Sequence, residues 1–268
     1  MGNIVVINGQ AVDASGYQPD LSADVYYEVA RLIDRKILFL DDHLLRFKKS
    51  LSASGLHYPG DHMILESLRI LLQQNDETLG NIRICLQKSR GKEPNLLCYF
   101  VPCYYPEPSM YLSGVQLVIY PHERSNPGIK KWDNRFRESV AGHIRDHGVY
   151  EVLLVNARGE ITEGSRSNVF FIDPMDRLVS PPEKDILPGI SRKYVLQICA
   201  DEHIEVIERP VFRTELGDLV GCFISGTSPK VLPVWQLEGT RFRVDHPVLR
   251  KIMEGFDALL QDNLKTIL

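Results

Sequence analysis

Two short stretches near the middle of the chain decide the fold: KKWDNR at residues 130–135 and ITEGSRSNVF at residues 161–170. The first follows residues 121–128, which combine charges, two prolines and a glycine, a composition typical of a link between folded parts. The second leads into a strand-like apolar run that begins at Val169. A linker, a pair of lysines and a carboxylate-bearing segment thus follow one another along the chain.

The segment before the linker has the pattern of a small α+β domain. Strand-like runs at 4–7 and 10–12 flank Asn8-Gly9, a dipeptide that favours the positive φ angles of a two-residue hairpin turn. A second hairpin is expected from the β-rich runs at 25–29 and 37–40. The other predicted elements are a helix capped by Asp41 or Asp42, a helix at 63–72, and strands at 82–86, 96–101 and 115–120. We expect this N-terminal domain to cover residues 1–120.

A larger C-terminal domain is expected after the linker, over residues 129–268. Apolar periodicity predicts helices at 136–147 and 191–200 and a closing helix from Pro247. Strands are predicted at 152–155, 169–172, 204–207 and 223–224. The fold class is therefore α+β or α/β, in two domains.

The composition excludes several classes of function. With 268 residues, 44% hydrophobic and 25% charged, the chain is an ordinary globular one with a full core. The net charge of −4 arises from interspersed signs without a basic run, which argues against nucleic acid or an anionic membrane as partner. No apolar stretch approaches the roughly 20 residues of a membrane span. A small-molecule partner is favoured.

The cysteines and histidines indicate neither disulfides nor a metal site. The five cysteines are odd in number and form no close CxxC pair, so we expect buried thiols and a cytoplasmic location. His143 and His147 are four residues apart, but no glutamate follows His143 in metalloprotease register, and an exposed helix face explains the pair better. No metal is expected. The HExxH, GxGxxG, Walker A and GxSxG motifs are absent.

The stretches at 130–135 and 161–170 resemble the class IV aminotransferases, the fold type IV enzymes of pyridoxal 5'-phosphate. Members have a lysine in a Lys-x-x-Asn segment and a later Thr-Glu-Gly-x-x-x-Asn segment. The resemblance covers essentially the whole chain, and it implies a C-terminal β pseudo-barrel flanked by helices. It also implies a homodimer that acts on amino acid and keto acid substrates.

The resemblance assigns chemical roles to Lys131 and Glu163. Two lysines compete for the Schiff base to the cofactor; counting back three residues from Asn134 gives Lys131, and the interval to Glu163 agrees without a gap. This amine must be unprotonated near neutral pH, which neighbouring cations favour. The Glu163 carboxylate would keep the pyridine nitrogen of the cofactor protonated. Without its partner motif, each stretch would be only a charged linker end or a polar turn.

The resemblance also implies three contacts to the cofactor phosphate. Arg46 matches a His-x-x-Arg helix, and its forked donors suit a phosphate. The turn at 187–192 matches Leu-x-Gly-Ile-Thr-Arg, with Gly189 and the amides of Ile190 and Ser191 at a helix N-terminus. Thr227 and Ser228 match the last phosphate turn.

The substrate is less well defined by the sequence. Residues 94–97 lack the arginine and histidine with which D-amino-acid members hold the substrate carboxylate, and Pro229-Lys230 and Phe136 depart from the branched-chain pattern. Tyr27 resembles a tyrosine on the substrate side of such sites, although a buried strand tyrosine fits equally well. Arg83, Arg90 and Arg166 are candidates for carboxylate binding. Aminodeoxychorismate lyase, which eliminates pyruvate with the same lysine, and a non-catalytic binding protein of this fold stay open as alternatives.

Overall fold

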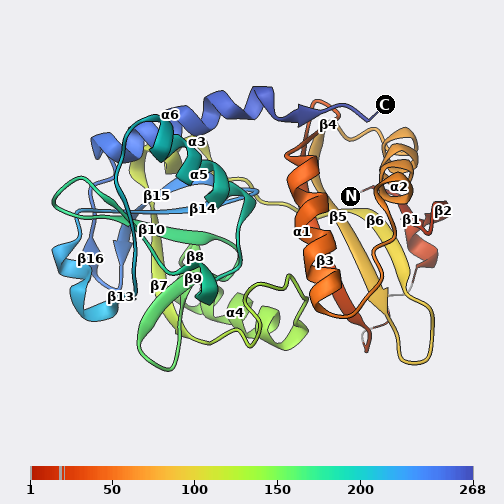
Figure 1. Cartoon of the computed structure of the whole chain (residues 1–268), viewed down its shortest axis with the longest axis horizontal. Helices are drawn as coiled ribbons and strands as arrows, with labels where there is room; N and C mark the ends of the chain where they lie inside the picture. The colour runs from red at the N-terminus through yellow and green to blue at the C-terminus, as the bar shows by residue number, and fades with distance from the viewer. Residues whose placement is uncertain (1, 18–19, 21, 268) are drawn as a thin grey trace. The chain divides into compact units, whose positions relative to one another are not determined.

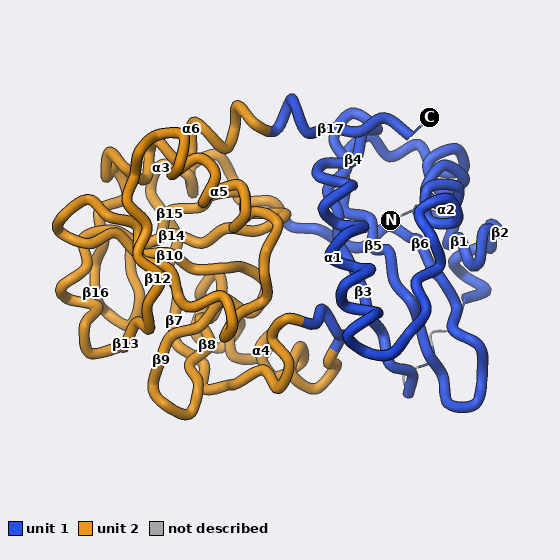
Figure 2. Tube along the Cα trace, in the orientation of Figure 1, with its two compact units in different colours: residues 1–104, 129–132, 260–268 blue, residues 105–128, 133–259 orange. Residues whose placement is uncertain are grey.

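The computed structural model describes residues 2–17, 20 and 22–267, which divide into two compact units. Unit 1 contains residues 1–104, 129–132 and 260–268, and unit 2 contains residues 105–128 and 133–259 (Figures 1 and 2). The chain therefore enters unit 1 three times. Among the described residues, every helix is too short or too polar to cross a bilayer.

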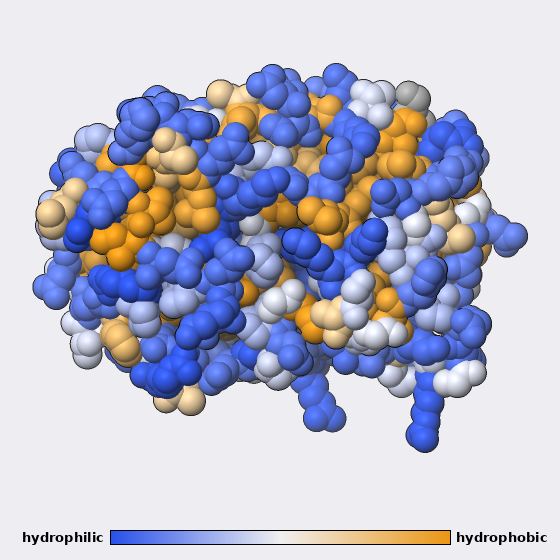
Figure 3. Space-filling view, viewed as in Figure 1, coloured by the Kyte–Doolittle hydropathy of each residue, from blue (hydrophilic) through white to orange (hydrophobic). Residues whose placement is uncertain are grey.

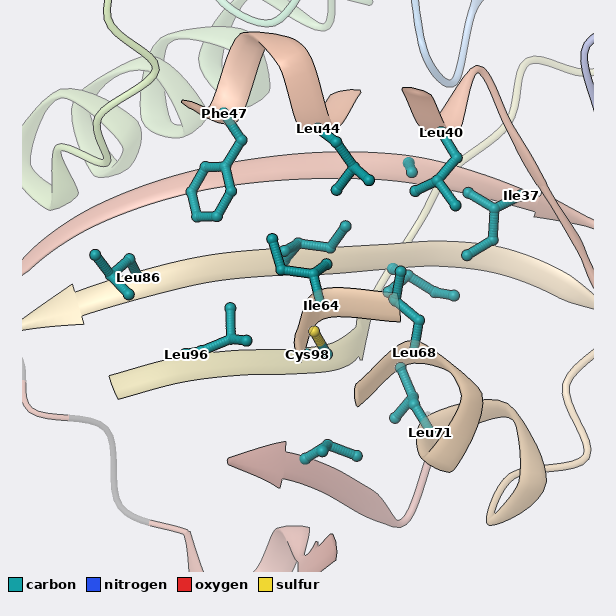
Figure 4. Close-up of a cluster of buried hydrophobic side chains, with 14 of the residues drawn as sticks. Ile37, Leu40, Leu44, Phe47, Ile64, Leu68, Leu71, Leu86, Leu96 and Cys98 are labelled. Carbon is teal, nitrogen blue, oxygen red and sulfur yellow. The ribbon is translucent and has the colours of Figure 1, made fainter. Parts of the chain in front are cut away.

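Unit 1 is a seven-stranded sheet with two helices. The strand order is β17-β4-β3-β5-β6-β1-β2. Its strands are β1 (Ile4–Ile7), β2 (Gln10–Asp13), β3 (Asp24–Ile33), β4 (Lys36–Leu38), β5 (Leu79–Lys88), β6 (Asn95–Val101) and β17 (Leu264–Lys265), and its helices are α1 (Leu40–Ala53) and α2 (Asp61–Gln73), with a short 3-10 turn at Ala14–Gly16. Leu44 and Phe47 on α1 and Leu68 on α2 are buried against the sheet, and Figure 4 shows them pointing into one apolar cluster.

Both hairpins predicted in unit 1 are confirmed. Ile7 pairs with Gln10 across Asn8-Gly9, and both turn residues have positive φ. Strands β3 and β4 also pair antiparallel. The cap predicted for α1 is wrong. The N-cap is Phe39, which makes no side-chain hydrogen bond there, and the helix begins at Leu40, one residue before Asp41. The two aspartates, Asp41 and Asp42, lie in the first turn, where their charge suits the positive helix end.

Unit 2 is built on a ten-stranded mixed sheet. Its main path runs β12-β11-β10-β14-β15-β7-β8-β9-β13, and β16 pairs with β15. The strands are β7 (Val115–Pro121), β8 (Glu151–Val155), β9 (Glu160–Gly164), β10 (Asn168–Ile172), β11 (Leu178–Ser180), β12 (Val206–Glu208), β13 (Val211–Phe212), β14 (Gly221–Gly226), β15 (Lys230–Leu237) and β16 (Thr240–Arg241). The helices are α3 (Pro108–Ser113), α4 (Asn134–His147), α5 (Ile190–Asp201) and α6 (Pro247–Asp262), with 3-10 turns at Glu183–Asp185 and Arg213–Asp218. Helix α3 contacts β15, helix α4 contacts β8, and helix α5 contacts β14.

The observed division differs from the boundary expected at residues 121–128. Residues 105–120 belong to unit 2 because β7 pairs with β8 and β15. Residues 129–132 return to unit 1, where Lys131 forms a bridge with Tyr26. The C-terminal residues also belong to unit 1, because Leu264 in β17 pairs with Leu38 in β4. The mixed α+β class is confirmed. Figure 3 shows hydrophilic side chains over much of one face and smaller apolar areas between them.

Candidate active site

Unit 1 holds a buried charge cluster at the contact of β3 with α1. Glu28 on β3 is fully buried and accepts hydrogen bonds from Arg46 Nε at 2.8 Å and Arg46 Nη2 at 2.6 Å. His43 Nδ1 lies 2.8 Å from Glu28 Oε2, the same oxygen that accepts from Arg46 Nη2. His43 and Arg46 are three residues apart on α1 and therefore share a helix face. The predicted phosphate arginine is thus held in place by a carboxylate.

The charges in this cluster are set by burial and by the arginine. Burial by itself would raise the pKa of Glu28, but the charge and hydrogen bonds of Arg46, with His43, outweigh it and lower that pKa to about 2. Burial lowers the pKa of His43, and Glu28 only partly opposes this effect. At neutral pH the cluster therefore combines a carboxylate, a guanidinium and a neutral imidazole that donates from Nδ1.

Lys130 and Lys131 lie beside β3 but have different neighbours. Lys131 Nζ is 2.7 Å from Asp24 Oδ1, and the two side chains are 45% and 57% exposed. Lys130 Nζ lies 5.0 Å from the centroid of the Tyr27 ring. Both lysines belong to unit 1, but one amine lies beside a carboxylate and the other beside an aromatic ring.

Aromatic side chains surround Arg83 next to these lysines. The Arg83 guanidinium carbon lies 4.3 Å from the Trp132 ring centroid and 5.2 Å from that of Tyr27, and Nη1 donates to the Tyr99 hydroxyl at 3.2 Å. Arg83 Nε is buried and has no hydrogen-bond partner within the described part of the chain. Tyr27 is itself buried and packs edge-on against Trp132 at 5.4 Å. A cation with an unused donor is therefore held among aromatic rings.

Glu163 is the central residue of the candidate site in unit 2. It lies on β9, a strand that is not among those predicted from the sequence, and it is 3% exposed. Arg124 Nε donates to its Oε1 at 2.7 Å, and the Leu187 amide donates to its Oε2 at 3.1 Å. Arg124 also donates to the Ser165 carbonyl. The carboxylate is thus fixed from both sides. Arg124 stands in the predicted linker, and no motif indicated its role.

Glu151 is a second residue that sequence reasoning missed. This buried carboxylate on β8 accepts hydrogen bonds from Ser165 Oγ at 2.9 Å, the Arg166 amide at 2.6 Å and Ser167 Oγ at 2.8 Å. It therefore fixes the turn that follows Glu163. Two serines spaced by one residue after Thr-Glu-Gly were a usable signal for such an acceptor.

The N-terminus of α5 presents the predicted amides. Helix α5 begins at Ile190, Gly189 is its N-cap, and no side chain caps it. The first amides of a helix without a side-chain cap suit an anion. A Cβ at Gly189 would overlap Asn168 Oδ1, and Asn168 Nδ2 donates to the Leu187 carbonyl. Glycine is needed here for close approach.

Thr227 and Ser228 lie in the turn between β14 and β15. Gly226 pairs with Lys230 across this turn, and Lys230 has a positive φ of 56°. The preceding Ser225 is buried, and its hydroxyl has no hydrogen-bond partner among the residues that the structure describes. This buried hydroxyl and the α5 N-terminus fit a phosphate group.

The predicted site residues lie in both units. Unit 1 contains Tyr27, Arg46 and Lys131, and unit 2 contains Glu163, Gly189, Ile190, Ser191, Thr227 and Ser228.

The departures from the family pattern have clear local settings. Leu96 and Leu97 are buried on β6, so they cannot replace the missing carboxylate-binding pair. Lys230 forms an ion pair with Asp257 at 2.5 Å. Phe136 is buried and stacks on His122 with centroids 4.2 Å apart. Four cysteines are buried, Cys103 is exposed, and all five are free.

Comparison with known proteins gives consistent matches. The family model for amino-transferase class IV matches residues 26–237. A D-alanine aminotransferase of Bacillus licheniformis is 25% identical, over 98% of this chain and 99% of that protein. A probable branched-chain-amino-acid aminotransferase of Thermotoga maritima is 29% identical, over 93% and 91%. The crystal structure of an Escherichia coli branched-chain aminotransferase has the same fold, with a TM-score of 0.85 at 20% identity over 100% of this chain and 99% of that one.

Proposed function

Because the chain belongs to the class IV aminotransferases, we propose that it exchanges an amino group between a small amino acid and a 2-keto acid. Enzymes of this family use pyridoxal 5'-phosphate, and the chain is a PLP-dependent aminotransferase. When bound, the cofactor supplies an aldehyde for the amino group and a ring that draws electrons from the substrate α carbon. None of the matches favours the lyase or the non-catalytic alternative.

The buried Glu163 carboxylate is the observation that carries the proposal. Arg124 and the Leu187 amide hold its two oxygens, so the carboxylate is fixed in direction. Such a group would retain a proton on the ring nitrogen of the cofactor. The donor set at the α5 N-terminus, Thr227 and Ser228 would hold the phosphate. In unit 1, the family resemblance implies Arg46, whose guanidinium is oriented by Glu28, as a further phosphate contact.

A lysine beside β3 would move the proton of the substrate. The spacing to Asn134 predicts Lys131 for this role, and that assignment stays a prediction. The amine would take the proton from the α carbon of the amino acid and return a proton at the cofactor carbon. For the substrate carboxylate we propose Arg83, because its buried Nε lies beside Tyr27 and Trp132. Tyr27 would line the same region.

The substrates, the assembly and the location belong to the same proposal. Relatives named D-alanine and branched-chain aminotransferases support a small apolar amino acid as donor. We also propose a homodimer, as the family resemblance implies, and a cytoplasmic location, as five free cysteines suggest.

A substrate screen tests the proposal directly. Purified protein loaded with pyridoxal 5'-phosphate is offered D- and L-alanine, leucine, isoleucine, valine and glutamate, each with 2-oxoglutarate or pyruvate. We expect amino acid formation from one keto acid, dependent on both substrates. The proposal would be contradicted if no pair of amino acid and keto acid reacted and the protein instead released pyruvate from aminodeoxychorismate without a keto acid acceptor. Gel filtration with light scattering tests the dimer.

A further inference from the structure

The register beside β3 places Lys130 and Lys131 on opposite faces. Tyr26 and Lys131 form an antiparallel bridge, the Tyr27 amide donates to the Lys130 carbonyl at 3.0 Å, and the Trp132 amide donates to the Val25 carbonyl at 2.8 Å. Side chains alternate along extended backbone. Lys130 therefore shares a face with Tyr27 and Trp132, and Lys131 shares one with Tyr26 and Asp24.

The setting of Lys131 favours its protonated form. Its Nζ lies 2.7 Å from the Asp24 carboxylate, which stabilises an ammonium ion over a neutral amine. Both side chains are about half exposed, so water also solvates the charge. An amine that must attack a carbonyl has to be neutral, and this setting opposes that.

Lys130 lies among groups that the proposed reaction uses. Its Nζ and the Arg83 guanidinium approach the same Tyr27 ring, at 5.0 and 5.2 Å. Its backbone amide lies 3.4 Å from Ser50 Oγ on α1, the helix that carries His43 and Arg46. The charge of Lys130 contributes to lowering the pKa of His43. Nearby cations favour loss of a proton from a lysine.

Resting on the function proposed above, we propose that Lys130, and not Lys131, forms the covalent bond to the cofactor. The neutral Lys130 nitrogen attacks the aldehyde carbon, a C=N bond replaces C=O, and the oxygen leaves as water with the two amine hydrogens. The same nitrogen, once released by substrate, is the base for the α-proton. Lys131 is a neighbour whose ion pair with Asp24 tethers residues 129–132 to β3.

Reductive labelling of the whole protein decides between the two lysines. The protein is loaded with pyridoxal 5'-phosphate and treated with borohydride, which adds a hydride to carbon and leaves a stable secondary amine. Trypsin does not cut after a modified lysine. A label on Lys130 gives a modified peptide of residues 125–131, whereas a label on Lys131 gives one of residues 131–135. Mass spectrometry separates these two products.

Each outcome has a defined meaning. We expect the peptide 125–131 to carry the label in the native protein, and again in Lys131→Arg. Lys130→Arg should lose the label and the visible absorbance of the bound cofactor while its circular dichroism spectrum stays native. A labelled 131–135 peptide in the native protein would overturn the assignment and leave the proposed function intact. Absence of label at both lysines, in protein shown to be folded, would overturn the assignment and the proposed function together.

Discussion

At the scale of single residues, the buried carboxylates distinguish structural from chemical roles. Glu28, Glu151 and Glu163 are all nearly inaccessible, yet their partners differ. Glu28 binds side chains of α1, and Glu151 binds the turn at residues 165–167. Glu163 instead has its oxygens held by Arg124 and a backbone amide. Of the three, it is the one whose stretch of sequence matches a known cofactor motif.

Glu163→Gln should lower kcat by about 100-fold or more, because a neutral amide does not keep the ring nitrogen of the cofactor protonated. The amide is nearly the same size, so the melting temperature should change little. Steady-state kinetics and the absorbance spectrum of the bound cofactor measure the effect. Glu160→Gln on the same strand, which removes an ion pair with Arg158, is the matched control and should retain wild-type kcat. Equal kcat in both variants would exclude Glu163 from the reaction.

Arg83→Lys should raise KM for the amino acid by about 10-fold with a smaller change in kcat, because lysine lacks the planar forked donors that pair with a carboxylate. The aromatic neighbours Tyr27 and Trp132 would still accept a cation, which limits the loss of stability. Arg90→Lys, on an exposed loop, serves as control and should leave KM unchanged. A change of KM in Arg90→Lys without one in Arg83→Lys would reverse the assignment of the carboxylate site.

At the scale of elements, the start of α5 and the contact of β3 with α1 each orient predicted cofactor-binding groups. Helix α5 is anchored by Arg192, a buried residue that forms ion pairs with Glu183 and Glu208, both at 2.9 Å. The N-terminal amides are thereby fixed in direction. On the other element, His43 and Arg46 project from one face of α1 toward Glu28.

Gly189→Ala should weaken cofactor binding by about 10-fold, because the added methyl group overlaps Asn168 and displaces the first turn of α5. The dissociation constant for pyridoxal 5'-phosphate, measured by fluorescence titration, reports this change. Gly217→Ala is the control, since a Cβ there meets nothing within 4 Å. Unchanged affinity in Gly189→Ala would mean that the α5 N-terminus does not hold the cofactor.

The β3–α1 cluster should make stability depend on pH in a predictable direction. The folded pKa values of His43 and Glu28 both lie below their ordinary values of 6.5 and 4.5, so both groups take up protons on unfolding. Their contribution to the free energy of unfolding is complete above pH 6.5. It decreases below that pH as His43 takes up a proton, and it decreases further from about pH 4.5 to 2 as Glu28 does. Urea unfolding at several pH values tests this. His43→Asn should flatten the upper part of the profile, and an unchanged profile would contradict the assignment.

At the scale of the whole molecule, the chain crosses between its units repeatedly. Unit 1 is completed by residues 129–132 and by the C-terminal strand β17, which lies at the edge of its sheet beside β4 (Figure 2). Asn263 accepts a bond from the Phe39 amide at 3.0 Å, and Lys265 pairs with Asp41 at 2.6 Å. The start of α1 is therefore stabilised by the far end of the chain.

Removal of residues 263–268 should lower the melting temperature by about 5 °C, since one edge strand and its ion pair are lost. Differential scanning calorimetry of the holoprotein provides the measurement. Lys265→Ala isolates the ion pair and should cost much less, because exposed pairs contribute at most about 1 kcal/mol. A truncated protein as stable as the full chain would show that β17 is dispensable.

The sequence by itself indicated many of the local elements and the family, and it predicted cofactor residues that stand in motifs, because period, turn chemistry and motif spacing are local properties. Asn8-Gly9 predicted its hairpin, and the Thr-Glu-Gly and Leu-Pro-Gly stretches pointed to Glu163 and Gly189. Only the tertiary structure decided which distant groups meet. Arg124 on Glu163, Glu151 beneath its turn, and Glu28 beneath Arg46 depend on strand pairing between remote segments. The same holds for Lys130 and Lys131. They are adjacent in sequence, but the strand register places their side chains on opposite faces, Lys131 beside Asp24 and Lys130 beside the Tyr27 ring.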